Sequence, residues 1–235
     1  MEYHVEDDYV VIDSVSESCS DYGTIYIPSI IEGLPVKVLG DGVHPILSAA
    51  TIVKGIDLSP TIEKISDYAC FGLESISSCY GSDIVSEIGI NAFYGTQYEQ
   101  SAKQLHSDIR LGKVLYRCYS TKQTVEISEN VEVIGKDAFR SNYYVKKIVF
   151  GENVVSIEDG AFMDCSKLQS IVIPDTVTFI GDYVFEGCTA LTSAEFGSGL
   201  QSIGADIFSG CTALKTVTAP SDSPAAALVI PAKTV

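Results

Sequence analysis

The stretch IGKDAF at 134–139 returns three times in related form: as IEDGAF at 157–162, IGDYVF at 180–185 and IGADIF at 203–208. Each copy starts 23 residues after the one before it. A fixed period of this length is the signature of a solenoid, in which each repeat is one structural unit stacked on the next. The sequence therefore predicts a coil built from 23-residue windings.

One complete copy, CSKLQSIVIPDTVTFIGDYVF at 165–185, indicates how a winding folds. Ile171 and Ile173 are two residues apart, so a strand points both of them to one face and Val172 to the other. A turn follows, and the apolar residues of 177–185 predict a second buried segment. No copy buries its apolar face alone, so neighbouring windings must cover it.

Stacking the windings places equivalent residues in columns. One column is predicted to be a buried aromatic row, and its members are Phe93, Tyr116, Phe139, Phe162, Phe185 and Phe208. Cys165, Cys188 and Cys211 also share one repeat position. Because a free Cys is a small apolar residue that is often buried, these three are predicted to belong to the core. Cys70 and Cys79 lie outside that row and would be able to pair in an oxidising compartment.

The chain is predicted to form a single repeat domain over residues 1–235. Residues 1–35 do not follow the repeat and predict an N-terminal cap with short strands, which covers the first open winding. Residues 36–218 carry the repeats. Residues 219–235 lose the motif and predict a C-terminal cap strand or a frayed end.

Two stretches depart from the regular spacing. The anchors Leu39 and Ile65 are 26 residues apart, so an insertion is expected at HPILSAA, 44–50, and either Cys70 or Phe71 fills the aromatic position of the next copy. Residues 96–110 are polar and lack the usual apolar strand. They predict either a distorted winding or a loop that bulges from the stack.

Composition excludes several functional classes. The net charge of −16 and the pI of about 4.4 disfavour nucleic-acid binding, because an acidic chain repels phosphate backbones. No run of about 18 apolar residues predicts a membrane span. The first residues, MEYHVEDDYVV, show no secretory signal, so the chain is either intracellular or the mature part of an exported protein.

The charge is unevenly distributed along the chain. Residues 103–147 hold nine of the 15 Lys and Arg residues but five of the 31 Asp and Glu residues, which gives this stretch +4 and leaves −20 for the rest. Two interpretations remain open. The stretch is either ordinary solvated surface or a central band for an anionic partner.

The residue pattern does not indicate a catalytic site. His4, His44 and His106 have no second His or Cys at ligand spacing, and the acids of 6–8 lack the alternating ligands of a calcium loop. No G-x-S-x-G sequence and no phosphate-binding loop occur. The sequence therefore predicts no catalytic residue, no cofactor, no metal site and no enzyme activity.

The segment IVIPDTVTFIGDYVFEGCTAL at 171–191 resembles the BspA-like leucine-rich repeats, also called the Treponema pallidum type. Their copies read approximately L-x-x-I-x-I-P-x-x-V-x-x-I-G-x-x-A-F-x-x-C, and the match covers about residues 36–218. The resemblance implies a mainly β solenoid, a right-handed leucine-rich-repeat coil of short parallel strands with few short helical turns. It also implies secreted or cell-surface proteins of bacteria or parasitic protists that bind host matrix proteins, other microbes or polymers.

The predicted function is therefore a non-catalytic binding or adhesion module of a secreted or cell-surface protein, with a protein or glycan as partner. The alternative is an intracellular or structural repeat scaffold in the cytoplasm. The predicted binding face consists of residues that point out of the core: Lys147, Val149, Ser170, Val172, Phe179, Ser193, Glu195, Thr216 and Thr218. Phe179 is either a contact residue or packs on Val155 and Val133 in neighbouring windings.

Overall fold

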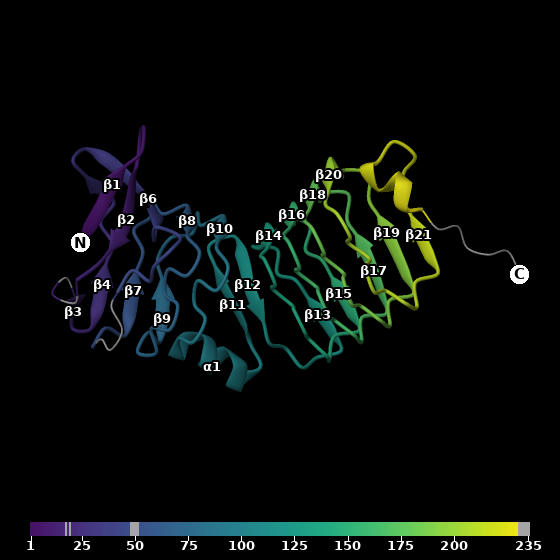
Figure 1. Cartoon of the computed structure of the whole chain (residues 1–235), viewed down its shortest axis with the longest axis horizontal. Helices are drawn as coiled ribbons and strands as arrows, with labels where there is room; N and C mark the ends of the chain where they lie inside the picture. Colours follow the sequence, from purple (N-terminus) through teal and green to yellow (C-terminus); the bar gives the residue numbers. More distant parts are fainter. Residues whose placement is uncertain (17, 19, 48–51, 230–235) are drawn as a thin grey trace, which may run out of the picture. The chain divides into compact units, whose positions relative to one another are not determined.

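The computed structural model describes residues 1–16, 18, 20–47 and 52–229. The chain divides into two compact units, Met1–Val114 and Leu115–Val235. Each unit is a β-solenoid, in which successive windings contribute short strands to two separate sheets (Figure 1). The predicted mainly β coil of parallel strands with little helix is thereby confirmed.

Unit 1 contains a sheet in the order β1-β2-β6-β8-β10, with β5 paired to β6, and a smaller sheet in the order β3-β4-β7-β9. The strands are β1 Glu2–Val5, β2 Val10–Ser14, β3 Ser20–Asp21, β4 Thr24–Tyr26, β5 Ile30–Ile31, β6 Leu34–Leu39, β7 Gly55–Asp57, β8 Lys64–Ile65, β9 Ser78–Tyr80 and β10 Glu87–Ile88. The pairs β1–β2, β3–β4 and β5–β6 are antiparallel. Residues 1–35 therefore form hairpins, whereas the later windings of this unit pair in parallel.

The polar stretch 96–110 forms the helix α1, Gln97–Leu105, followed by β11, Asp108–Leu111. Thr96 caps the helix by accepting the N–H of Glu99 at 3.1 Å, and the Glu99 carboxylate accepts the N–H of Gly95 at 3.1 Å. This is a variant of the capping box, in which the Glu99 side chain accepts the N–H of the residue before the N-cap and not that of Thr96 itself. Of the two predicted alternatives, the bulging loop was wrong and the winding is distorted, with a helix that the T-x-x-E signature at 96–99 indicates.

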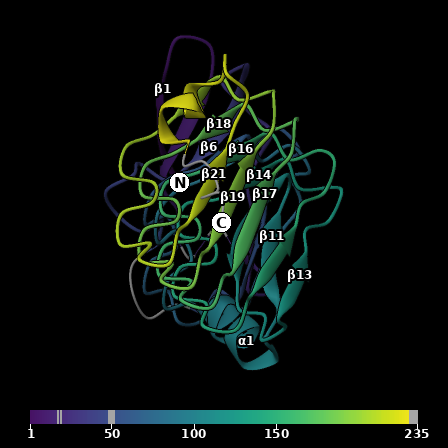
Figure 2. The same cartoon turned by 90° about the vertical axis from the view of Figure 1, so that its right-hand side faces the viewer.

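The strands of the later windings fall in two sheets, in the orders β11-β12-β14-β16-β18-β20 and β13-β15-β17-β19-β21. Within unit 2, the pairs from β14 to β20 and from β13 to β21 are parallel. The strands are β12 Val114–Cys118, β13 Thr124–Glu126, β14 Val133–Ile134, β15 Lys147–Val149, β16 Ser156–Ile157, β17 Ser170–Ile173, β18 Phe179–Ile180, β19 Ser193–Phe196, β20 Ser202–Ile203 and β21 Thr216–Thr218. Figure 2 shows the neighbouring strands β17, β19 and β21 running in the same direction. Paired residues are 23 apart, as Ile171 with Ala194 and Ile180 with Ile203.

The predicted aromatic column runs through the interior of unit 2. Phe139, Phe162 and Phe185 are fully buried, and their rings stack with centroids 4.9 and 5.5 Å apart. Phe208 continues the stack at 5.7 Å but is only partly buried, because it belongs to the last winding. In unit 1, Cys70 fills the aromatic position and is buried, whereas Phe71 is 40% exposed.

At one repeat position, a glycine packs against an aspartate of the preceding winding. The N–H of Asp182 donates to the Asp159 carboxylate at 2.9 Å, which folds this carboxylate over Gly181. A Cβ atom on Gly181 would lie 2.6 Å from the backbone nitrogen of Asp159 and closer still to its carboxylate oxygen. Where Lys136 stands in place of the aspartate, the next winding carries Glu158 instead of glycine. Gly89 after Asp67 and Gly204 after Asp182 repeat the arrangement.

A 3-10 helix, η2 at Pro224–Leu228, follows the last strand and packs on β20 and β21. Ser223 caps it by accepting the N–H of Ala225 at 3.2 Å. The predicted cap strand or frayed end around Leu228 is therefore wrong within the described residues, and residues 230–235 lie outside them. Residues 48–50 of the expected insertion also lie outside the described residues, whereas Ile46 and Leu47 are buried.

Candidate functional site

Eight of the nine residues predicted for the binding face lie on the outward side of the β13–β21 sheet. We call this surface the strand face, and it consists of Lys147, Val149, Ser170, Val172, Ser193, Glu195, Thr216 and Thr218. Their strand neighbours Ile148, Ile171, Ala194 and Val217 point inward and are buried. The period-two alternation therefore separates core from surface as the sequence predicts.

The residues of the strand face form two columns across the sheet. One column pairs Lys147 with Ser170, and continues to Ser193 and Thr216. The second begins at Glu126 on β13, opposite Val149, and ends with Val172 opposite Glu195 and Glu195 opposite Thr218. Val149 and Val172 are 41% and 56% exposed at the centre of the second column. The strand face thus has an apolar centre between charged and polar ends.

Phe179 lies apart from the other eight residues. It belongs to β18 in the other sheet, where Ser156 and Ser202 are its partners in register. Its side chain is 38% exposed, as is that of Val155 beside it in the preceding winding. The nine predicted residues therefore occupy two sheets, and Phe179 is not part of the strand face.

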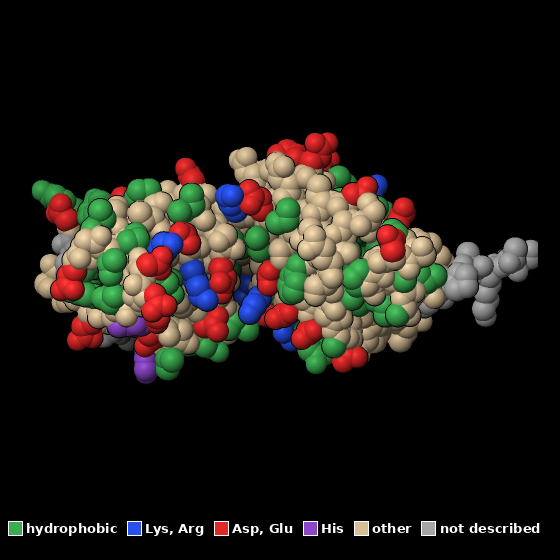
Figure 3. Space-filling model, turned by 90° about the horizontal axis from the view of Figure 1, so that it is seen from above, with side chains coloured by type: hydrophobic (Ala, Val, Ile, Leu, Met, Phe, Trp, Pro, Cys, Tyr) green, Lys and Arg blue, Asp and Glu red, His purple; other side chains and the backbone are tan. Residues whose placement is uncertain are grey.

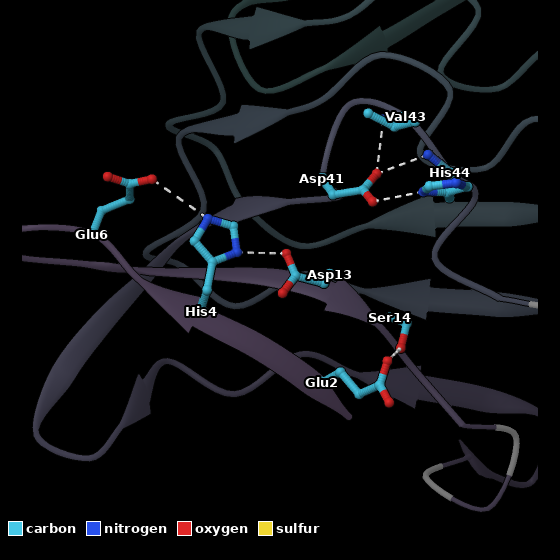
Figure 4. Close-up of polar contacts among 8 residues, drawn as sticks. All are labelled: Glu2, His4, Glu6, Asp13, Ser14, Asp41, Val43 and His44. Atoms are coloured by element: carbon cyan, nitrogen blue, oxygen red, sulfur yellow. Dashed lines mark hydrogen bonds and ion pairs between the residues drawn. The ribbon is translucent and has the colours of Figure 1, made fainter.

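Polar contacts cluster at the N-terminal hairpin (Figure 4). His4 on β1 lies between Asp13, at 2.7 Å from its Nδ1, and Glu6, at 3.4 Å from its Nε2. Glu2 accepts a hydrogen bond from the Ser14 hydroxyl at 2.8 Å on the same hairpin. His4 and Glu6 are about half exposed and Asp13 is 28% exposed, so the cluster links the two strands without enclosing a site.

Asp41 and His44 form a second polar pair in the turn after β6 (Figure 4). Burial alone would raise the pKa of Asp41, but hydrogen bonds from the His44 ring and from the backbone N–H groups of His44 and Val43 outweigh it and lower the pKa to about 2. The two backbone bonds are both 2.8 Å long. Asp41 therefore stabilises this turn as a carboxylate.

A groove of about 270 Å³ opens on unit 1 between the β1–β2 turn and the strands β6, β8 and β10. Lys37 pairs with Glu63 at 3.3 Å and Lys64 pairs with Glu87 at 2.7 Å along it. The Lys37 ammonium also lies 5.8 Å from the centroid of the Tyr9 ring. Both lysines of the groove are thus already paired with a glutamate of the next winding.

The cysteines of the repeat are buried thiols with hydrogen-bonded sulfur atoms. Cys165 and Cys188 are fully buried and Cys211 is partly buried, and each thiol donates to a Phe carbonyl of the preceding winding at 3.0–3.2 Å. Burial raises the pKa of Cys165 to about 12. Cys70 and Cys79 are also free and buried, while Cys19 lies outside the described residues. The thiols of Cys70, Cys79, Cys165 and Cys188 therefore belong to the core, and that of Cys211 lies at its end.

Within residues 1–16, 18, 20–47 and 52–229, no group of three or more His, Cys, Asp or Glu side chains is placed to hold a metal ion. None of the helices in this part of the chain combines the length and the apolar character that crossing a bilayer requires. Asp and Glu side chains predominate over Lys and Arg on the face shown in Figure 3.

The sequence prediction missed two exposed tyrosines next to the strand face. Tyr143 and Tyr144 lie in the turn before β15, and each is 56% exposed. Later windings carry Ser166 and Thr189 at the first of these positions and Lys167 at the second. A comparison of equivalent positions between windings, which singles out residues that break the repeat, would have found them.

One family model matches the chain, described as BspA type leucine rich repeat region (6 copies), and it covers residues 47–165 and 110–225. No curated protein matches the chain. The matched residues include both columns of the strand face.

Several solved structures are similar to the chain. The crystal structure of a T. pallidum leucine-rich repeat protein is 23% identical, with 91% of this chain and 87% of that chain covered and a TM-score of 0.43. A leucine-rich repeat protein from Eubacterium ventriosum is 16% identical, with 91% and 74% covered and a TM-score of 0.46. A leucine-rich cell surface protein from Faecalibacterium prausnitzii is 16% identical, with 94% and 87% covered and a TM-score of 0.42.

Proposed function

The chain belongs to the BspA-type leucine-rich repeat family, and on that premise we propose that it is a non-catalytic binding module of a secreted or cell-surface protein. It engages a protein or a glycan through the strand face and serves in adhesion. Leucine-rich repeat proteins are in general non-catalytic interaction scaffolds, and BspA-type members are typically bacterial cell-surface proteins. This family background supports the class of function, whereas the choice of surface rests on the geometry.

The observation that carries the proposal is the exposed centre of the strand face. Val149 and Val172 stand on neighbouring parallel strands with their side chains in solvent, between Glu126 and Glu195. An apolar centre with a polar rim is the usual arrangement of a protein interface. Because the sheet already satisfies the backbone of its strands, a partner would bind a surface that needs little ordering.

The test is an array of purified extracellular matrix proteins and glycans, probed with the full chain. The variant Val149→Thr/Val172→Thr carries in both positions the residue that Thr218 already supplies in the same column. We expect it to fold and to lose most of the array signal of the wild type. The matched control is Val155→Thr, since Thr178 stands at the equivalent position one winding later.

The control is expected to keep the wild-type signal. Equal loss in both variants would show that the strand face is not the contact surface. No saturable binding of the wild-type chain to any spotted protein or glycan would contradict the proposal and favour the repeat scaffold.

A further inference from the structure

We propose that the edge of the strand face where the chain enters β15 and β17 binds an anionic polysaccharide, which is a glycan chain that carries sulfate or carboxylate groups. The surface, which we call the lysine–tyrosine edge, consists of Tyr143, Tyr144, Lys146, Lys147 and Lys167 in and beside the turns that lead into β15 and β17. The inference rests on the proposed function, because it names the class of partner for that binding module.

The turn that presents the tyrosines is fixed by a buried side chain. Asn142 stands at the repeat position that Cys occupies in later windings, and its Nδ2 donates to the Ser120 carbonyl at 3.0 Å. Its Oδ1 accepts the N–H of Tyr144 at 3.0 Å and the N–H of Val145 at 3.1 Å. This network holds Tyr143 and Tyr144 at the surface, with more than half of each side chain in solvent.

Backbone hydrogen bonds between successive windings fix the positions of the lysines beside the tyrosines. The N–H groups of Lys146 and Lys147 both donate to the Gln123 carbonyl, at 2.7 and 3.0 Å, and the N–H of Gln169 donates to the Lys146 carbonyl at 3.0 Å. Gln123, Lys146 and Gln169 therefore follow one another at the strand spacing of about 4.8 Å. Lys167 is exposed at the position that Tyr144 holds one winding earlier.

The cations of this edge are available to a ligand. Among the described residues, Lys146, Lys147 and Lys167 make no ion pair, whereas Arg140 pairs with Asp137 at 3.2 Å. The net charge of −16 does not cancel such a local group, because interactions between exposed charges are screened beyond about 8 Å at physiological salt. The edge is therefore a local cationic site on an acidic chain.

The combination of side chains fits a charged glycan better than a charged peptide. The ammonium groups of the lysines pair with sulfate or carboxylate groups, and the Gln123 and Gln169 amides supply both donors and acceptors for hydroxyl groups. The two tyrosine rings supply apolar surface for the C–H faces of sugar rings and a phenol for hydrogen bonding. An octaglutamate peptide supplies carboxylates for the lysines but no sugar ring face for the tyrosines.

The experiment titrates the full chain into fluorescein-labelled octasaccharides of heparin and of hyaluronan, and into an octaglutamate peptide, with fluorescence polarisation as the readout. The lysine pair variant, Lys146→Gln/Lys167→Ala, introduces the residues that Gln123 and Ala190 supply at the same repeat positions, and it leaves Lys147 of the strand face unchanged. The matched control is Lys215→Gln, because Lys215 holds the repeat position of Lys146 three windings later, without tyrosines beside it.

We expect the wild type to bind a heparin or hyaluronan octasaccharide, and the lysine pair variant to bind about tenfold more weakly. The control Lys215→Gln should change affinity less than twofold. The variant Tyr143→Ser/Tyr144→Ala should weaken binding while leaving the salt dependence unchanged, since no charge is removed. Heparin preference identifies sulfate as the recognised group, and hyaluronan binding identifies carboxylate.

Three outcomes would overturn the inference: no binding of either octasaccharide at low salt, equal losses in Lys215→Gln and the lysine pair variant, or tighter binding of octaglutamate than of both glycans. The array described above separates this inference from the proposed function. If the valine variant loses the array signal and the lysine pair variant keeps it, the lysine–tyrosine edge fails alone. If the lysine pair variant loses the array signal and the valine variant keeps it, the proposed role of the strand face is wrong and that of the lysine–tyrosine edge stands.

Discussion

The substitution Phe185→Ala is expected to lower the unfolding free energy by about 4–5 kcal/mol. Phe185 is fully buried, and its ring stacks between Phe162 at 5.5 Å and Phe208 at 5.7 Å. Truncation of a core Phe costs about 3–5 kcal/mol, and the upper part of that range applies where the site cannot collapse. The backbone bonds from Phe185 to Ile207 and from Phe162 to Val184 hold the windings at a fixed spacing, so the cavity stays open.

Two matched substitutions test whether the stacked column, and not phenylalanine as such, determines this cost. Phe208 has one stacked neighbour and is only partly buried, so Phe208→Ala should cost less than Phe185→Ala, about 2–3 kcal/mol. Phe179 is 38% exposed on β18, and Phe179→Ala should stay below about 1 kcal/mol.

The assay is urea unfolding followed by far-UV circular dichroism and by fluorescence of the 13 tyrosines, since the chain has no tryptophan. Coincident transitions and equal m-values establish that two-state free energies are valid for this repeat protein. A loss below about 1 kcal/mol for Phe185→Ala, or an equal loss for Phe179→Ala, would refute the inward column.

Gly181→Ala is expected to cost about 1–3 kcal/mol in the same urea titration, because the new methyl group meets the backbone of Asp159; an unchanged midpoint would contradict this. The hydrogen bonds that lower the pKa of Asp41 to about 2 stabilise the fold above pH 4, and this stabilisation is lost as the pH falls towards 2. Wild type and Asp41→Asn should therefore differ in stability at pH 6 and converge near pH 2, and a constant difference across this window would count against the His44–Asp41 pairing. Because burial raises the pKa of Cys165 to about 12, its thiol should react with Ellman's reagent only after unfolding in urea, and rapid labelling of the folded chain at this residue would place it at the surface.

The sequence predicts those features that depend on the 23-residue period. Because Phe139, Phe162 and Phe185 are equally spaced, they fall in one column whatever path each winding takes. The burial of their rings therefore follows from the register of the windings. Strand alternation likewise separates Ile171 from Val172. The same period puts Phe179 in the second segment of its winding, and β18 lies in the other sheet, so an outward position alone does not make Phe179 part of the strand face.

Features that depend on local exceptions to the repeat were not predicted. The helix α1 begins with a four-residue capping signal at Thr96 inside a polar segment, where the solenoid period gives no information. The tyrosine turn depends on Asn142, which replaces a cysteine and fixes the backbone of the following residues by hydrogen bonds. The contribution of the strand face and of the lysine–tyrosine edge to binding stays a prediction.

The register of the windings is tested most directly by engineered disulfides on the outer side of β19 and β21. Glu195 and Thr218 are partners in register, at a strand spacing of about 4.8 Å, within the range that a disulfide spans. After mild oxidation, peptide mass spectrometry should find the cross-link in Glu195→Cys/Thr218→Cys and not in Glu195→Cys/Thr216→Cys, whose Cα atoms lie about 8 Å apart. A cross-link to position 216 and none to position 218 would contradict the in-register coil.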